Sequence, residues 1–104
     1  MAWIARSYCA RKLQGEIDLG LVGEIVQVNT AFLKLLMQNE MIPVVAPIGL
    51  GEHGELYNIN ADVAATEIAI LRAEKLVYLS DTDGVIVHGA LVPTLAKSEA
   101  QERI

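Results

Sequence analysis

The chain has 104 residues and a formal net charge of −5, and 53% of its residues are apolar, with a mean hydropathy of +0.38. This is enough for one small domain with a modest core, and the high apolar fraction indicates strands buried on both faces or a part of a larger protein. The basic residues form no cluster beyond Arg6, Arg11 and Lys12, which argues against nucleic-acid binding, since such binding depends on neutralising phosphates.

Membrane insertion and secretion are not expected either. The longest uncharged apolar run, Met41–Gly51, is too short to span a bilayer and contains two prolines. Residues 1–13 are interrupted by basic side chains and lack the apolar centre of a signal peptide. The single Cys9 cannot form an internal disulfide, and no Cys or His cluster has metal-ligand spacing. We therefore expect a cytoplasmic protein that has no metal site of its own and does not bind a membrane.

The first third of the chain predicts two strands and a helix. Residues 1–14 are the least regular part, and a first strand is suggested there only by Trp3, Ile4, Tyr8 and Cys9. Gly20 and Gly23 indicate a turn or a close approach of the backbone. Glu24–Val28 alternates as a short strand does.

A helix follows this strand. Asn29 or Thr30 is typical of its N-cap, and Asn39 is a plausible stop. The apolar side of this helix is expected to consist of Phe32, Leu35, Leu36 and Met37.

The middle of the chain predicts a strand, a helix and a second strand. Ile42–Ile48 is the clearest buried strand and is followed by a glycine-rich loop at 49–54 and an extended piece at 56–59. Val63–Ala73 is expected to be a helix, and Lys75–Ser80 a second buried strand. Such a βαβ unit joins parallel neighbours in a right-handed sense, and apolar strands of this kind are covered on both faces. The predicted fold is therefore α/β, with a mostly parallel sheet flanked by helices in three αβα layers.

The end of the chain predicts a small hairpin and a last helix. Val85–Val92 reads as the hairpin, with His88 and Gly89 at its tip. The helix is expected at Thr94–Ile104.

The strongest candidate site is the stretch Tyr57–Thr66, Y-N-I-N-A-D-V-A-A-T. Asn58, Asn60 and Asp62 are spaced two residues apart, so an extended backbone places them on one face. They lie where the chain enters a helix, and the N-terminal end of a helix favours anionic ligands. The alternative is a plain N-cap, which needs only one such residue.

A second candidate loop, Asp81–Gly84 (D-T-D-G), follows the second predicted strand. Ligands of open parallel sheets bind at the carboxyl ends of the strands, so Asp81 and Asp83 could hold a metal or a ribose hydroxyl. The alternative is an ordinary turn, because Asp and Gly are turn residues. Cys9, His53 and His88 have no local partner that would give them a chemical role.

Four stretches of the chain resemble the amino-acid kinase family, and within it the N-acetylglutamate kinases. They are D-L-G-L-V-G-E-I-V-Q-V-N (18–29), I-P-V-V-A-P-I-G (42–49), L-Y-N-I-N-A-D-V-A-A-T (56–66) and L-V-Y-L-S-D-T-D-G-V-I (76–86). The N-I-N-A-D part is the most specific to N-acetylglutamate kinases, whereas S-D-x-x-G-V occurs in several members. The resemblance implies one partial amino-acid kinase domain over 1–104, with residues 1–9 unmatched.

This resemblance implies transfer of the γ-phosphate of ATP, with Mg²⁺, to the carboxylate of N-acetyl-L-glutamate, a step of arginine biosynthesis. It implies that Asn58 and Asn60 bind this substrate and that Asp62 organises the catalytic lysines. The nucleotide-binding residues it implies are Asp81, Thr82, Asp83, Gly84, Val85 and Ile86. A homo-oligomer is expected for the full-length enzyme.

The chain also departs from the family pattern. Family members are roughly two to three times longer, and the glycine-rich segment and the lysines that hold the phosphates have no counterpart here. Lys12 and Lys75 do not lie in those motifs. The sequence therefore indicates an inactive or weakly active part of the kinase. A non-catalytic binding module and another amino-acid kinase are the alternatives.

Overall fold

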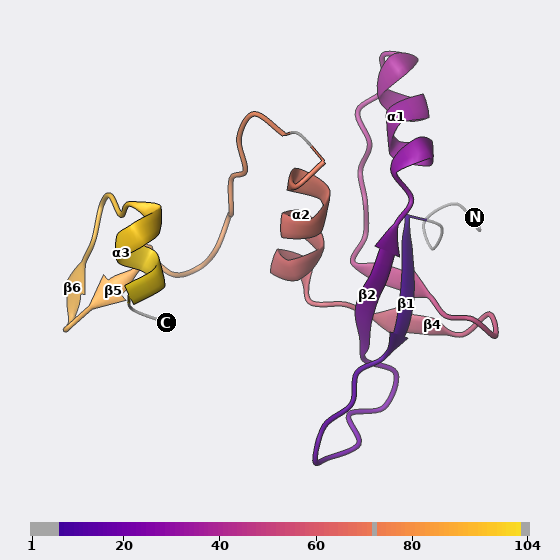
Figure 1. The fold of residues 1–104 in the computed structure, drawn as a ribbon, viewed down its shortest axis with the longest axis horizontal. Helices are drawn as coiled ribbons and strands as arrows, with labels where there is room; N and C mark the ends of the chain where they lie inside the picture. Colours follow the sequence, from indigo (N-terminus) through magenta and orange to yellow (C-terminus); the bar gives the residue numbers. More distant parts are fainter. Residues whose placement is uncertain (1–6, 72, 103–104) are drawn as a thin grey trace.

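The computed structural model describes residues 7–71 and 73–102. Figure 1 shows a larger body at residues 7–71, a smaller C-terminal unit at residues 84–102, and an extended segment at residues 73–83 that joins them. The elements in chain order are β1 (Tyr8–Lys12), β2 (Gly23–Val28), α1 (Thr30–Gln38), β3 (Ile48–Leu50), β4 (Leu56–Asn58), α2 (Ala61–Ala69), β5 (Ile86–Val87), β6 (Ala90–Leu91) and α3 (Lys97–Glu102).

The body contains a four-stranded sheet in the order β2-β1-β3-β4. β1 runs antiparallel to β2 and parallel to β3, and β3 runs antiparallel to β4. The predicted α/β class, a sheet flanked by helices, is confirmed. The sheet is mixed and not mostly parallel as predicted, since two of its three strand pairs are antiparallel. The short connections at 13–22 and 51–55 join these antiparallel neighbours.

The core of the body forms where β1 and β4 meet α2. Tyr8 is only 2% exposed, and it packs with Ala10, Tyr57, Ile59 and Ala64 in one buried cluster. The Tyr8 hydroxyl donates a hydrogen bond to the Ala64 carbonyl oxygen at 3.3 Å, which ties the sheet to α2. The first strand, weakly indicated by the sequence, is thus the centre of the fold.

The predicted helix after β2 is confirmed as α1. The Asn29 side-chain oxygen accepts a hydrogen bond from the Phe32 amide at 3.1 Å, and Asn39 ends the helix. The predicted apolar face is wrong, because Leu33 is the residue that α1 buries while Leu35 and Met37 are exposed. Leu33 lines the apolar cavity that Tyr8 and Ala64 also line.

The predicted strand Ile42–Ile48 is wrong except at its last residue, because β3 begins at Ile48. Residues 41–46 form no strand, and Ile42 and Val44 are 89% and 93% exposed. This segment borders an apolar cavity of about 500 Å³ between α1 and α2. Strands need hydrogen-bonded neighbours, and in the described residues only the end of this segment pairs with a strand, where Ile48 lies opposite Asn58 of β4.

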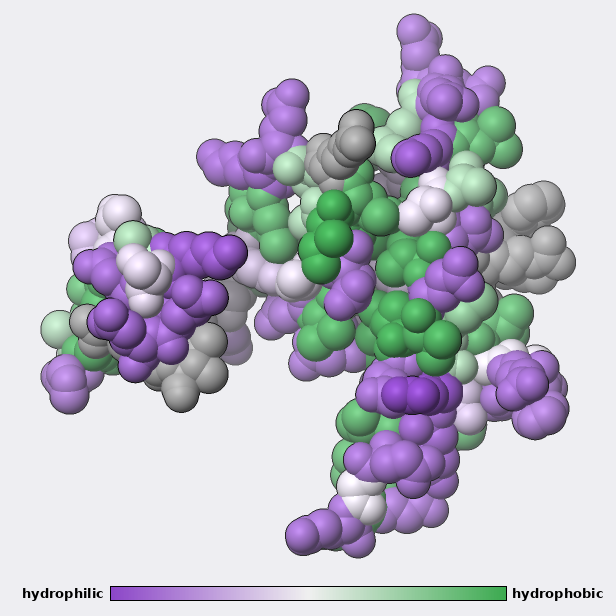
Figure 2. All heavy atoms as spheres, in the orientation of Figure 1, coloured by the Kyte–Doolittle hydropathy of each residue, from purple (hydrophilic) through white to green (hydrophobic). Residues whose placement is uncertain are grey.

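The second predicted strand, Lys75–Ser80, is also wrong. It lies in the extended segment, and Leu79 is 95% exposed. The predicted parallel pair of strands is therefore not formed among the described residues. Figure 2 shows apolar side chains gathered on the visible face of the body. Apolar residues that no other element covers contribute to this surface. The helix between the two segments is confirmed as α2, although it begins at Ala61 and not at Val63.

The C-terminal unit agrees with the predicted hairpin. Ile86 pairs with Leu91 and Val87 with Ala90, and His88 and Gly89 form the tip with φ of 50° and 78°. Two positive φ values are typical of a type I′ turn, which matches the twist of the flanking strands. The last helix is shorter than predicted, and Trp3, Ile4 and residues 103–104 lie outside the described residues.

Candidate functional site

The junction between β4 and α2 places the predicted polar residues on the surface. Tyr57 and Ile59 are buried. Asn58, which lies between them in the sequence, and Asn60, which follows Ile59, are exposed. Asp62 follows in the first turn of α2 and is exposed as well. The predicted alternation is present at Asn58 and Asn60, which face away from the core, but Asp62 lies in helix α2 and not on the extended backbone where it was predicted.

Asn60 caps helix α2 at this junction. Its side-chain oxygen accepts hydrogen bonds from the amides of Asp62 at 3.0 Å and Val63 at 3.1 Å, so it is the N-cap of α2. The plain-cap interpretation thus holds for this residue. The same amide group still carries two N–H donors, and the helix end adds a positive dipole that favours anions.

Residues 18–23, called the glycine segment below, lie beside Asn58, and the sequence analysis did not connect them to this site. The Asn58 amide donates to the Leu21 carbonyl oxygen at 2.8 Å, and Val22 forms a bridge with Asn58. Gly23 permits this approach, because a Cβ atom there would lie 2.5 Å from the Tyr57 Cβ atom. The spacing of Gly20 and Gly23 was the available signal, and the predicted turn and close approach are both confirmed.

The predicted nucleotide loop, 81–86, is an exposed polar turn. The Ser80 hydroxyl lies 3.1 Å from the Thr82 hydroxyl and accepts from the Thr82 amide at 3.3 Å. Gly84 has φ of 138°, a conformation that favours glycine, and Ile86 begins β5. Figure 1 shows that the extended segment returns alongside α2 before it reaches this loop, whereas β5 lies away from the body.

Two residues that the sequence analysis did not assign to a site link the extended segment to α2. The Thr66 hydroxyl donates to the Asp62 carbonyl oxygen at 2.7 Å. The Tyr78 hydroxyl is hydrogen-bonded to the Thr66 hydroxyl and lies 3.5 Å from the same Asp62 carbonyl oxygen. No periodic signal in the sequence could have shown this pairing, because it joins a helix to an irregular segment.

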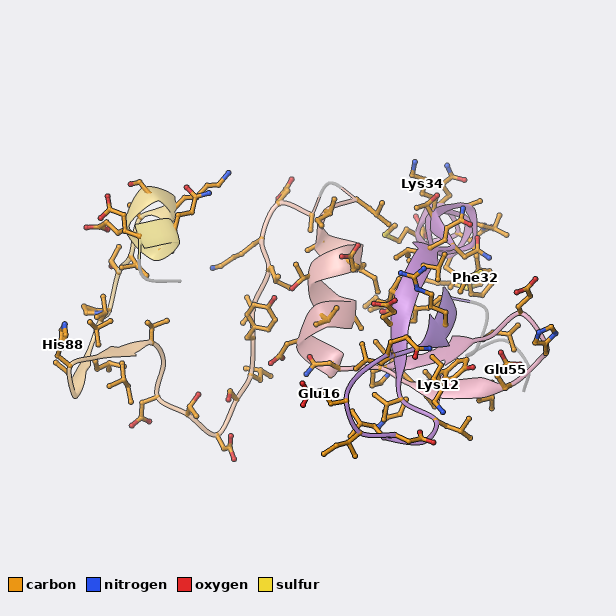
Figure 3. All side chains as sticks on the ribbon, turned by 60° about the horizontal axis from the view of Figure 1, so that its bottom comes forward. Lys12, Glu16, Phe32, Lys34, Glu55 and His88 are labelled. Carbon is orange, nitrogen blue, oxygen red and sulfur yellow. The ribbon has the colours of Figure 1, made fainter. Side chains whose placement is uncertain are left out.

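The lysines of the body do not converge on the junction. Lys12 forms an ion pair with Asp18 at 2.9 Å, and Figure 3 shows Lys34 on α1, away from Lys12. Hydrogen bonds from Lys12 and from the Gly20 amide hold the pKa of the Asp18 carboxyl below its usual range. The positive charge of Lys12 is thus already matched by a carboxylate of the glycine segment.

The described part of the chain contains neither a preformed cluster of metal ligands nor a helix that could span a membrane. Within 7–71 and 73–102, no group of three or more His, Cys, Asp or Glu side chains could enclose a metal ion. Asp81 and Asp83 are exposed acidic side chains in one loop, which suits Mg²⁺ carried by a nucleotide, since Mg²⁺ uses one or two carboxylates plus phosphates. No helix in these residues is long and apolar enough to cross a bilayer.

The chain is similar to known proteins over almost its whole length. Residues 3–102 match the amino acid kinase family. The acetylglutamate kinase of Aquifex aeolicus (strain VF5) is 53% identical over 91 residues, which are 86% of this chain and 30% of that protein. The acetylglutamate kinase of Pelodictyon phaeoclathratiforme (strain DSM 5477 / BU-1) is 53% identical over 87 residues, covering 83% of this chain and 29% of that protein. The chain therefore spans about three tenths of the length of these relatives.

The fold also has a counterpart among solved structures. A crystal structure of smu.665 from Streptococcus mutans UA159 has a TM-score of 0.85 and 30% sequence identity. The likeness covers 99% of this chain and 42% of that chain. The described arrangement, including the extended segment beside α2, is therefore similar to a part of a larger solved fold.

Proposed function

This chain belongs to the amino acid kinase family, and we propose that it is a part of an acetylglutamate kinase. The complete enzyme transfers the γ-phosphate of ATP to the side-chain carboxylate of N-acetyl-L-glutamate, giving an acyl phosphate in arginine biosynthesis. The proposal is carried by the N-I-N-A-D stretch, which lies at the start of α2 in a chain 53% identical to acetylglutamate kinases.

In this proposal the β4–α2 junction binds the acetylated amino acid. The side-chain amides of Asn58 and Asn60 carry N–H donors suited to a carboxylate or an acyl oxygen. The N-terminal end of α2 adds a favourable field for the anion. Asp62, in the first turn of that helix, is the proposed organiser of the catalytic lysines.

The loop 81–86 is the proposed nucleotide site. Its Thr82 hydroxyl and main-chain groups are exposed and can hydrogen-bond a nucleotide, and Gly84 leaves room for one to approach the backbone. A Mg²⁺ ion bound to ATP neutralises phosphate charge, and Asp81 and Asp83 are the residues that would face it. Phosphoryl transfer depends on positioning and charge neutralisation more than on a protein nucleophile.

The proposal also covers the setting of the enzyme. We place it in the cytoplasm, where the exposed, unpaired Cys9 would stay reduced. We also expect a homo-oligomer for the full-length enzyme.

Thermal unfolding of the purified chain tests this function. A ligand that binds only the folded state raises the unfolding midpoint. We expect N-acetyl-L-glutamate and Mg·ATP each to raise it, and N-acetyl-L-glutamine, which lacks the side-chain carboxylate, to raise it less. Asn58→Ala should reduce the N-acetyl-L-glutamate shift, whereas Asn39→Ala, which removes an exposed amide at the far end of α1, should not. Equal midpoints with and without both ligands would refute the proposal for this chain.

A binding module without catalysis is the alternative, because Lys12 is already paired with Asp18. Phosphate release or acyl phosphate formation by the purified chain would exclude that alternative. Ligand-induced shifts without any turnover would favour it. A shift with free glutamate as large as that with N-acetyl-L-glutamate would instead indicate another amino acid kinase.

A further inference from the structure

The hydroxyl group of Tyr78 connects two parts of the molecule that are far apart in sequence. Tyr78 lies in the extended segment, and its hydroxyl is hydrogen-bonded to Thr66, in the middle of α2. It also lies 3.5 Å from the carbonyl oxygen of Asp62, in the first turn of that helix. The contact therefore joins two parts of the molecule. One is the segment that leads into the 81–86 loop, and the other is the turn of α2 that carries Asp62.

This network is formed by two hydroxyl groups and one carbonyl oxygen. Each hydroxyl has one proton to donate and two lone pairs that accept. The Thr66 hydroxyl lies 2.7 Å from the Asp62 carbonyl oxygen. Either hydroxyl of the Tyr78–Thr66 pair can be the donor, and the Tyr78 hydroxyl also donates to the Asp62 carbonyl oxygen at 3.5 Å, so Tyr78, Thr66 and Asp62 form one hydrogen-bonded network. Hydrogen bonds in such a network polarise and strengthen one another.

This link matters because the extended segment has few other attachments. In the described residues, the main chain of 74–83 forms no hydrogen bond with α2 or with the sheet. Its neighbouring apolar side chains, Val77 and Leu79, are largely exposed. The Tyr78 hydroxyl is thus the polar anchor that holds this segment along α2.

The hydrogen bond of Tyr78 lies close in sequence to both regions that the proposed function uses. Tyr78 lies three residues before Asp81, where the predicted nucleotide loop begins, while Thr66 lies one helical turn after Asp62. A tether of this length limits how far the loop can move from the start of α2. In an acyl-phosphate-forming kinase, the phosphate donor and the acceptor must be held within reach of each other.

We propose that Tyr78 is a positioning residue that, through the Thr66 hydroxyl, ties the segment leading into the 81–86 loop to the Asp62 turn of α2. This inference rests on the proposed kinase function for its consequence, which is ordered presentation of the nucleotide. Tyr78 itself does not touch the reacting groups in this proposal. Its hydroxyl fixes the geometry of the residues that do.

The experiment compares Tyr78→Phe and Thr66→Val with the wild-type chain. Both changes keep the size of the side chain and remove a hydroxyl group. Tyr57→Phe is the matched control, because it removes a tyrosine hydroxyl that bonds Glu55 at 3.3 Å, away from this network. Thr66→Ser keeps the hydroxyl and should restore the wild-type behaviour.

The first measurement is the backbone ¹⁵N heteronuclear NOE, which reports motion on the picosecond to nanosecond timescale. We expect the values at residues 77–83 to fall in Tyr78→Phe and Thr66→Val and to stay unchanged in Tyr57→Phe and Thr66→Ser. Unchanged values in the first two variants would overturn the proposed tether, whether or not the chain binds a nucleotide.

The second measurement is the affinity for Mg·ATP. We expect a loss of about fivefold in Tyr78→Phe, the size of one hydrogen bond, and no further loss in the double variant with Thr66→Val. Fully additive losses would overturn action through Thr66. A wild-type chain that binds no Mg·ATP would refute the nucleotide site of the proposed function, and the NOE values alone would then decide the tether.

Discussion

The first strand and two apolar segments of the chain behave in opposite ways. β1 alternates poorly in sequence, yet it lies at the centre of the sheet, with β2 on one side and β3 on the other. Residues 41–46 and 75–80 are the clearest apolar runs, yet neither forms a strand, and both carry exposed apolar side chains. The difference teaches that a strand is decided by the availability of a hydrogen-bonding neighbour, and that apolar composition alone does not form one.

The largest expected effect tests this contrast directly. Tyr8→Ala should lower the free energy of unfolding by about 3–5 kcal/mol, because it removes a buried aromatic ring and leaves a cavity. Leu79→Ala should change it by less than about 0.5 kcal/mol, because that side chain is already in water. Urea unfolding measures both. A large effect of Leu79→Ala would show that residues 75–80 are packed in solution.

A second test concerns the close packing of the glycine segment on β4. Gly23→Ala should destabilise the chain by about 1–3 kcal/mol, because its Cβ atom would overlap the Tyr57 side chain and crowd the Arg11 carbonyl oxygen. Gly15→Ala is the control, since its Cβ atom would meet only the Ile17 carbonyl oxygen at 3.7 Å. Equal urea midpoints for the two variants would contradict the packing described here.

The helix cap at the candidate site has a smaller expected effect. Asn60→Ala should cost about 1 kcal/mol of stability, because the amides of Asp62 and Val63 lose their acceptor. Asn60→Asp keeps an acceptor and should restore most of that loss. If Asn60 also binds N-acetyl-L-glutamate, Asn60→Asp should still weaken binding, because a carboxylate repels the anion. Thermal unfolding with and without this ligand separates the two roles.

The smallest expected effect is a pH dependence in the core. Burial raises the pKa of the Tyr8 hydroxyl above its ordinary value near 10. The stability associated with its neutral form is therefore fully present below about pH 10 and is lost as the pH rises through the higher pKa of the folded chain. Tyr8→Phe should remove this part of the alkaline loss, at a cost of about 1 kcal/mol at neutral pH for the bond to Ala64. Urea midpoints at pH 8 and pH 11 give the comparison, and an unchanged alkaline loss in Tyr8→Phe would contradict it.

Much of the local structure was predictable because it depends on neighbouring residues. Asn29 as a cap, the Ile86–Leu91 hairpin and the exposure of Asn58 and Asn60 all follow from short-range rules of capping, turn type and alternation. The composition of Asp81–Gly84 also predicts an ordinary turn, and the hydrogen bonds of this loop with Ser80 are those of a local turn. Its nucleotide role stays a prediction.

The features that the sequence did not predict share one physical cause. They depend on contacts between residues that are far apart in the sequence. The predicted buried face of α1 was wrong because the orientation of a helix is set by what it packs against, and Leu33 is the residue that is buried at the cavity beside α2. The link between Asn58 and Leu21 spans 37 residues, and the link between Tyr78 and Thr66 spans 12. Neither leaves a periodic pattern in the sequence.

The sequence by itself determined the family, the helix caps, the terminal hairpin and the polar face that leads into α2, because each is encoded by residues close together in the chain. The tertiary structure alone decided which apolar segments became strands, which helix face was buried and which hydroxyl tied the extended segment to α2. The physical reason is that backbone hydrogen bonds within a helix or turn are satisfied locally, whereas those of a strand need a partner that the sequence does not name.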